Sequence, residues 1–250
     1  MIQSVTFGDK NTWDDWHLLA TKRPVFQPPA PKTVIVDIPG GNGALDLSTS
    51  LTGYPVYANR TGSFEFIVEN GYGLWAHRYS DIMQYLHGRA MKAVLFDDPE
   101  YFYEGRFSVE SWESNITWST ITISYNVGPY KWKFQDSTEP WLWDPFNFDS
   151  GVIFPDLFTE IMINSPSAWD ARFFPGELFG QAPISPIFMV TGAVDLQVRF
   201  INQTLGIDEI MDLHNGANEA PKFIFHGDPT YSMSFKGIGT IDIKFRAGRL

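Results

Sequence analysis

Residues 32–60 read KTVIVDIPGGNGALDLSTSLTGYPVYANR, and this stretch decides the fold. The β-branched residues of Val34–Ile38 favour an extended strand. The segment Pro39–Gly43 supplies the positive-φ positions that a sharp reversal needs. After it, Leu45 and Leu47 alternate with polar neighbours, which is the period of a half-buried returning strand. The stretch therefore predicts a long β-hairpin.

A hairpin of this length is at best marginally stable by itself in water. We therefore expect the segment Thr33–Leu47 to lie against another surface. Adding a strand to the sheet of a partner is an established use of such an arm.

The rest of the chain is typical of an antiparallel β protein, because short alternating runs are separated by glycine and proline. The run Ile121–Val127 predicts one strand with a single buried face. The segments Tyr101–Tyr103 and Arg106–Trp112 predict two more strands, with a turn at Glu104-Gly105. One segment, Ser80–His87, predicts a short helix capped by its serine and ended by the following glycine.

A change in composition predicts a domain boundary. The segment QDSTEPWLWDP contains two prolines and three acidic residues and has no periodicity. We therefore expect a β-sandwich domain at residues 1–135 that carries the helix and the hairpin, and a second β-sandwich at residues 136–250. Strands in the second domain are expected at Val194–Phe200, Lys222–His226 and Ile241–Phe245. In the first of these, Val194, Leu196, Val198 and Phe200 are expected on one face.

Composition excludes several classes of protein. The 250 residues carry a net charge of −11 and contain no cysteine. Disulfide scaffolds and thiolate zinc sites are therefore excluded, and sequence-specific nucleic-acid binding is disfavoured. The start MIQSVTFGDK lacks a signal pattern, and no apolar run reaches the ~18 residues of a membrane span. We expect a soluble product made in the cytoplasm, without membrane insertion.

Catalytic patterns are missing from the sequence. The glycines of Gly40–Gly43 are followed by a strand and lack the lysine of a phosphate loop. The sequence has no G-x-S-x-G elbow, and none of its five histidines has a second histidine within four residues. The adjacent pair Asp97 and Asp98, before Pro99, is typical of a β-turn. We predict no catalytic residues, no cofactor and no metal.

Three tryptophans, Trp141, Trp143 and Trp169, leave two interpretations open. An exposed tryptophan can stack on a sugar, so these side chains are candidate sugar-binding residues. Large aromatic side chains more often fill cores or interfaces, and burial is the interpretation we favour.

Six segments in order carry a family resemblance: FGDKNTWDDWHL (7–18), IPGGNGALDL (38–47), YANR (57–60), LHGR (86–89), LFDDPEYFYEGR (95–106) and GPYK (128–131). In this order and spacing the chain resembles the distal tail proteins of long, non-contractile-tailed bacteriophages. The resemblance covers residues 7 to 131. It departs from the family at Val127-Gly128, where a cysteine-aspartate pair is common.

The resemblance implies a structural, non-enzymatic virion protein at the tip of a phage tail. Six copies would close into a ring between the tail tube protein and the tail-associated hub protein, and the second domain would be galectin-like. A receptor-binding protein or a host-wall saccharide would be a further partner. The candidate residues of the arm between neighbouring copies are Thr33, Ile35, Ile38, Gly40, Gly43, Leu45 and Leu47.

Three alternatives remain open: a carbohydrate-binding module, a glycosidase or other hydrolase, and the tail tube protein itself. A saturable quench of tryptophan fluorescence by glycans would favour the first. Stacked tubes instead of rings in electron micrographs would favour the third.

Overall fold

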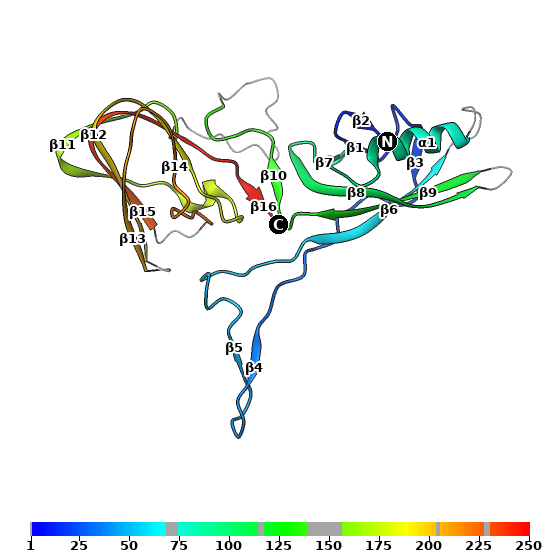
Figure 1. The fold of residues 1–250 in the computed structure, drawn as a ribbon, viewed down its shortest axis with the longest axis horizontal. Helices are drawn as coiled ribbons and strands as arrows, with labels where there is room; N and C mark the ends of the chain where they lie inside the picture. The colour runs from blue at the N-terminus through cyan, green and yellow to red at the C-terminus, as the bar shows by residue number, and fades with distance from the viewer. Residues whose placement is uncertain (1, 69–74, 115–117, 140–156, 204–205, 228–230) are drawn as a thin grey trace. The chain divides into compact units, whose positions relative to one another are not determined.

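The computed structural model describes residues 2–68, 75–114, 118–139, 157–203, 206–227 and 231–250. The chain divides into two compact units (Figure 1). Unit 1 is Met1–Trp132 together with Leu250, and unit 2 is Lys133–Arg249. Sequence analysis places the boundary between residues 135 and 136. The chain is mostly β, as predicted, with one α-helix in the part of the chain that the structure describes.

Unit 1 is built around an antiparallel sheet in the order β2-β1-β7-β8-β9-β6-β3. The strands are β1 (Val5–Phe7), β2 (Lys10–Asn11), β3 (Leu18–Ala20), β6 (Arg60–Val68), β7 (Arg89–Leu95), β8 (Tyr101–Ser114) and β9 (Ser119–Val127). The short strand β10 (Lys131–Lys133) spans the division between the units.

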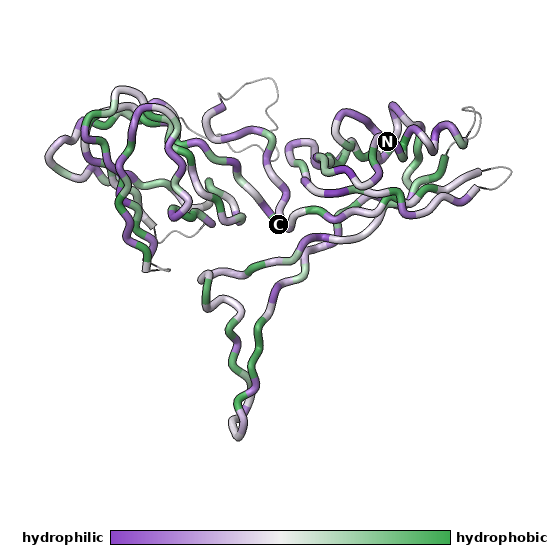
Figure 2. Tube along the Cα trace, viewed as in Figure 1, coloured by the Kyte–Doolittle hydropathy of each residue, from purple (hydrophilic) through white to green (hydrophobic). Residues whose placement is uncertain are grey.

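The alternation of apolar and polar residues along the central strands builds the core of unit 1. In β9, Ile121, Ile123 and Val127 are fully buried and Tyr125 nearly so, which confirms the predicted strand. Residues of one parity face the core in a sheet with one covered face. Figure 2 shows hydrophobic residues along the strands of this sheet. Several of the largest core side chains are aromatic: Phe7, Trp16, Phe26, Phe64, Phe66 and Phe107.

Helix α1 (Trp75–Leu86) starts earlier than predicted. Ser80 does not cap it, because its Oγ donates a 2.9 Å hydrogen bond to the Ala76 carbonyl inside the helix. Serine can bond the carbonyl four residues back as well as cap a first turn. Ile82 and Leu86 are fully buried and fasten the helix to the core. Gly88 follows with φ +74°, which agrees with the predicted end.

Gly105 lies inside strand β8 and does not form the predicted turn. The pair Gly105 and Val127 is in register between β8 and β9. A Cβ at Gly105 would lie 2.3 Å from the backbone oxygen of Asn126. The glycine therefore marks a close approach of two strands, which sequence alone does not distinguish from a turn.

Unit 2 contains a sheet in the order β11-β15-β12-β13, with β14 also paired to β12. Its elements are β11 (Ile161–Arg172), the 3-10 helix η1 (Gly176–Phe179), β12 (Ile187–Asn202), β13 (Ile207–Asp212), β14 (Gly216–Glu219), β15 (Tyr231–Lys244) and β16 (Gly248–Arg249). Figure 1 shows the long strands curled. They enclose buried phenylalanines: Phe158, Phe179, Phe188, Phe200, Phe223, Phe225 and Phe235. The galectin-like character of this unit stays a prediction.

Two details of unit 2 differ from the predicted pattern. Val194 does not share the buried face of Leu196 and Val198 but is 55% exposed, because β12 bulges between Val194 and Gln197. The segment Lys222–His226 is not a strand. It holds its phenylalanines in the core through an isolated bridge between Phe225 and Ile184.

The described residues contain no helix long and apolar enough to cross a membrane.

Candidate functional site: an exposed hairpin arm

The predicted hairpin is present and forms a two-stranded sheet of its own. Strand β4 (Ile35–Asp37) pairs antiparallel with β5 (Ala44–Asp46), and in the described part of the chain these strands pair with no other strand. We call Thr33–Leu47 the arm (Figure 1). Such an isolated two-stranded sheet gains little stability of its own.

The reversal of the arm is made by glycines, as predicted. Gly40 and Gly43 have φ of +78° and +80°, a region that residues with a Cβ avoid. Between them, the Gly41 N–H donates a 3.0 Å hydrogen bond to the Ile38 carbonyl. The reversal therefore needs glycine for its backbone conformation, and no ligand is needed to explain its sequence.

The register of the arm gives its two faces different chemistry. Val36 is paired with Leu45, and the Leu47 N–H donates to the Val34 carbonyl at 2.8 Å. Because paired residues point to the same side of a sheet, one face is entirely apolar. We call it the apolar face; its residues are Val34, Val36, Ile38, Leu45 and Leu47. The other face carries Ile35, Asp37, Ala44 and Asp46.

This division separates the predicted arm residues. Ile38, Leu45 and Leu47 share the apolar face. Ile35 lies on the other face, which we call the acidic face because it carries Asp37 and Asp46. Val34 and Val36 belong to the apolar face but are missing from the predicted set. Counting alternate residues outward from the Gly40–Gly43 reversal is the signal that identifies them.

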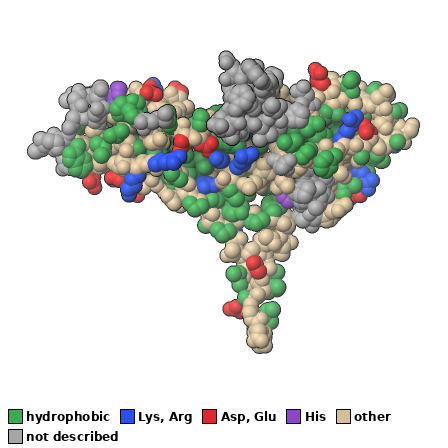
Figure 3. Space-filling view, turned by 180° about the vertical axis from the view of Figure 1, so that it is seen from behind, with side chains coloured by type: hydrophobic (Ala, Val, Ile, Leu, Met, Phe, Trp, Pro, Cys, Tyr) green, Lys and Arg blue, Asp and Glu red, His purple; other side chains and the backbone are tan. Residues whose placement is uncertain are grey.

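The apolar face is uncovered. Val34 is 54% exposed, Val36 45% and Ile38 52%. Figure 3 shows hydrophobic side chains along the arm, with isolated acidic ones among them. Contiguous exposed apolar side chains on this scale mark a surface that another molecule covers.

The segments before and after the arm, which we call its two stems, pair antiparallel at its base. The Lys32 N–H donates to the Val56 carbonyl at 2.7 Å, and the Ala58 N–H donates to the Ala30 carbonyl at 2.8 Å. These bonds hold the stems together just outside the arm. They fix where both strands leave unit 1.

The first stem is anchored in the core of unit 1 by Phe26 and Gln27. The Phe26 ring lies 4.0 Å from the ring of Tyr103, and the Gln27 N–H donates a 2.9 Å bond to the Tyr125 hydroxyl. Arg60, only 5% exposed, donates from Nη1 to the Gln27 carbonyl at 3.0 Å and from Nε to the Pro129 carbonyl at 2.8 Å.

Burial governs the electrostatics of this anchor. Loss of hydration lowers the pKa of Arg60 and raises the pKa of Tyr103 and of Tyr125. The two phenols therefore stay neutral over the whole physiological range, and the guanidinium stays charged. Arg60, Tyr103 and Tyr125 therefore hold the first stem of the arm in place.

The arm itself is acidic. Its charged residues are Asp37 and Asp46, and no lysine or arginine lies between Thr33 and Asn59. Hydrogen bonds from the side chain and the backbone N–H of Ser48 lower the pKa of Asp46. Asp46 therefore stays ionised at neutral pH, and the face that carries it is the one that favours water.

The remaining residues singled out in the sequence are three tryptophans and the pair Asp97 and Asp98. Trp169 is half-buried in β11, while Trp141 and Trp143 lie outside the described residues. Asp97 contacts Arg23, and Asp98 is 2.6 Å from the Lys131 ammonium, at a turn closed by the bond from the Asp98 N–H to the Leu95 carbonyl. Each carboxylate thus has its own cation. Within the described ranges, no group of three or more histidine, aspartate or glutamate side chains could hold a metal.

Comparison with known proteins gives a fold likeness. No protein-family model matches the chain, and no curated protein matches it. Among solved structures, the chain is similar to the crystal structure of SPP1 Dit, a protein described as a paradigm of the hub adsorption apparatus in phages that infect Gram-positive bacteria. The TM-score is 0.62 at 12% identity, and the match covers 100% of both chains. The chain therefore has the fold of that protein along its whole length.

Proposed function

We propose that this chain is a structural protein of a phage tail tip, and that six copies close into a ring. The observation that carries the proposal is the uncovered apolar face of the arm on a chain with the Dit fold. SPP1 Dit belongs to a hub adsorption apparatus, which makes a tail-tip role the natural one for the same fold. The inference from fold to role is an analogy, so the arm must supply the test.

The arm supplies the contact between copies. If the arm of each copy lies on a different surface of the next copy, the interface is head-to-tail. Such interfaces close into rings when the rotation between copies allows it. The apolar face would lie on the neighbour, because its burial is favourable by about 25 cal/mol per Å² of apolar surface. The acidic face would remain in water.

The ring would join the tail tube protein on one side to the tail-associated hub protein on the other. A receptor-binding protein or a host-wall saccharide would be a further partner. The net charge of −11 suits a conduit for DNA, because like charges repel and DNA passes without adhering. In this role the protein is a virion component, catalyses no reaction and needs no cofactor.

Solution mass by light scattering, combined with negative-stain imaging, tests the ring. The full chain should give six times its mass of 28.4 kDa and rings with a central opening. Deleting Ile38–Leu47 should reduce the mass to that of a single chain. A ring that survives the deletion would show that the arm does not join copies, and stacked tubes would instead identify a tube protein.

Two variants at neighbouring cross-strand pairs test which face of the arm makes the contact. Val36→Ser with Leu45→Ser changes one pair on the apolar face, and Asp37→Ser with Ala44→Ser changes the adjacent pair on the acidic face. The first double variant should abolish rings, and the second should leave them intact. The proposal is wrong about the face if the second variant alone dissociates the ring.

A further inference from the structure

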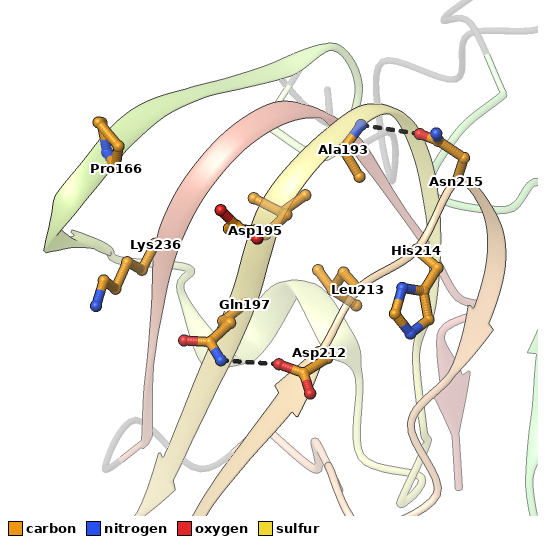
Figure 4. Close-up of a pocket in the computed structure, with 10 residues that line it drawn as sticks. Pro166, Ala193, Asp195, Gln197, Asp212, Leu213, His214, Asn215 and Lys236 are labelled. Carbon is orange, nitrogen blue, oxygen red and sulfur yellow. Dashed lines mark hydrogen bonds between the residues drawn. The ribbon is translucent and has the colours of Figure 1, made fainter.

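A polar hollow of about 680 Å³ lies on unit 2. Figure 4 shows its lining, which comes from β11, β12, β13, the segment after β13, and β15. The polar side chains used here are Asp195, Gln197, Asp212, His214 and Lys236. None of them belongs to the arm or to its anchor.

Three neighbouring strands deliver three of these side chains to one face. Gln197 of β12 is in register with Lys236 of β15 on one side and with Asp212 of β13 on the other. The Gln197 amide donates a 2.8 Å bond from Nε2 to Asp212 Oδ1 (Figure 4). The row therefore presents an ammonium, an amide and a carboxylate side by side on rigid strands.

A β-bulge supplies Asp195. Between Val194 and Gln197 the strand β12 has two residues opposite the single Gly237 of β15. Asp195 has φ +48°, an uncommon conformation for a residue with a Cβ. A Cβ at Gly237 would lie 2.4 Å from the Asp195 carbonyl oxygen, so only glycine lets the bulge form. Bulges of this kind re-aim a side chain beside functional sites.

The hollow offers hydrogen-bonding groups that the protein itself does not use. Within the described ranges, the carboxylate of Asp195, the imidazole of His214 and the ammonium of Lys236 have no hydrogen-bond or ion-pair partner. By contrast, Asn215 is occupied, since its Oδ1 accepts a 2.8 Å bond from the Ala193 N–H. Acceptors and donors are thus both available around the same hollow.

We propose that this hollow binds an uncharged, hydroxyl-rich ligand, a saccharide unit. Sugar hydroxyls both donate and accept, which matches a wall holding carboxylates, an amide and an ammonium. Leu196 and Leu213 also line the hollow but are each only 2% exposed, so its polar side chains would make the contacts. The proposal does not depend on the ring, since every residue that it uses lies in unit 2.

Other ligand classes fit less well. An anion would meet two carboxylates against one ammonium. A metal ion would need three closely grouped ligands, and the described residues contain no such group. An apolar ligand would strip water from Asp195 and Lys236 without replacing their hydrogen bonds.

Saturation-transfer NMR on the full chain tests the site with galactose, glucose and N-acetylglucosamine as probes. At least one sugar should give a saturable signal at its ring protons, with millimolar affinity. Asp195→Gly should weaken that binding about tenfold or more, because a hydrogen bond to a charged group is lost. Glycine suits φ +48°, so this variant keeps the fold.

Glu160→Gly is the matched control. Glu160 is also an exposed acidic residue of unit 2 with positive φ, at +51°, and it does not line the hollow. Its variant should bind sugar as the unchanged protein does. Equal losses in the two variants, or no saturable signal with any of the three sugars, would overturn the proposal. A signal that appears only with added calcium chloride would also overturn it, because the sugar would then be held by a metal.

Discussion

The backbone N–H of Gln27 donates a 2.9 Å hydrogen bond to the hydroxyl of Tyr125, a residue 98 positions further along the chain. Gln27 lies in the stem that leads into the arm, and Tyr125 lies in the central strand β9. This bond connects an exposed, weakly paired segment to the most buried part of unit 1. The direction in which the arm leaves unit 1 is therefore set by core packing.

Replacing Tyr125 by phenylalanine removes this connection. The Gln27 N–H loses its acceptor while the ring stays in place, and a partly buried hydrogen bond of this kind contributes about 0.5–1.5 kcal/mol. Calorimetry should show a lower Tm, and hydrogen exchange at Gln27 should become faster. Tyr79→Phe is the control, because Tyr79 packs on Trp112 through its ring and its hydroxyl makes no hydrogen bond to the described residues. Equal effects of the two variants would show that the bond contributes nothing.

A substitution at Gly62, the cross-strand partner of Tyr125 in β6, should displace the same hydroxyl. A Cβ at Gly62 would lie 2.5 Å from Tyr125 Oη and 2.8 Å from Cζ. Gly62→Ala should therefore displace the phenol and destabilise the protein by about 1–3 kcal/mol. Gly128→Ala is the control, since a Cβ there meets its nearest atom at 3.8 Å. Retention of the Gln27 exchange rate in Gly62→Ala would contradict the displacement.

The sequence predicted those parts of the fold that repeat with a simple period. Apolar and polar residues alternate in Ile121–Val127 because only one face of the strand is buried. This pattern can be recognised in the sequence, so β9 was predicted correctly. The reversal at Gly40–Gly43 was predicted because positive φ at two positions favours glycine. The apolar face of the arm was incompletely predicted, since its residues are fixed by the pairing of Val36 with Leu45.

Features decided by long-range contacts were not predictable. Gly105 was assigned to a turn, but its role is to let the backbone of Asn126 approach. Val194 was expected on the same face as Leu196 and Val198, but the bulge opposite Gly237 turns it outward. In both places the deciding partner lies on another strand. The polar hollow depends on the same bulge, and the sequence gives no sign of it. An aspartate among the alternating residues of a predicted strand indicates an ordinary exposed position, so Asp195 was missed.

Unit 2 should lose stability at acid pH through Asp136. Burial alone would raise the pKa of this carboxyl, but hydrogen bonds from the Thr138 hydroxyl and N–H, at 2.8 and 2.9 Å, and the Lys244 ammonium at 3.3 Å outweigh it and lower the pKa. The stabilisation is therefore complete above the unfolded value of 3.8 and is lost as pH falls through the lower folded pKa.

Denaturant unfolding between neutral pH and pH 2 measures this effect. Asp136→Asn should be less stable than the unchanged protein at neutral pH, and the difference should shrink as the pH falls below the unfolded value. Thr138→Val removes one donor only and should give a smaller change in the same direction. A stability difference between Asp136→Asn and the unchanged protein that stays constant with pH would show that the carboxyl is not held by these donors.

Gly237→Ala tests the bulge that shapes the polar hollow. The new Cβ would meet the Asp195 carbonyl oxygen at 2.4 Å and the Leu196 Cα at 2.6 Å, and φ +116° is itself unfavourable for alanine. Because both contacts are backbone atoms, β12 must shift.

Gly192→Ala is the control. Gly192 has φ +67° but open space around a Cβ, so the variant costs only the conformational term of about 1 kcal/mol. Calorimetry should show a clearly larger fall in Tm for Gly237→Ala, and sugar binding should be lost in this variant alone. Equal falls in Tm would mean that the close approach of the two strands does not hold the bulge in place.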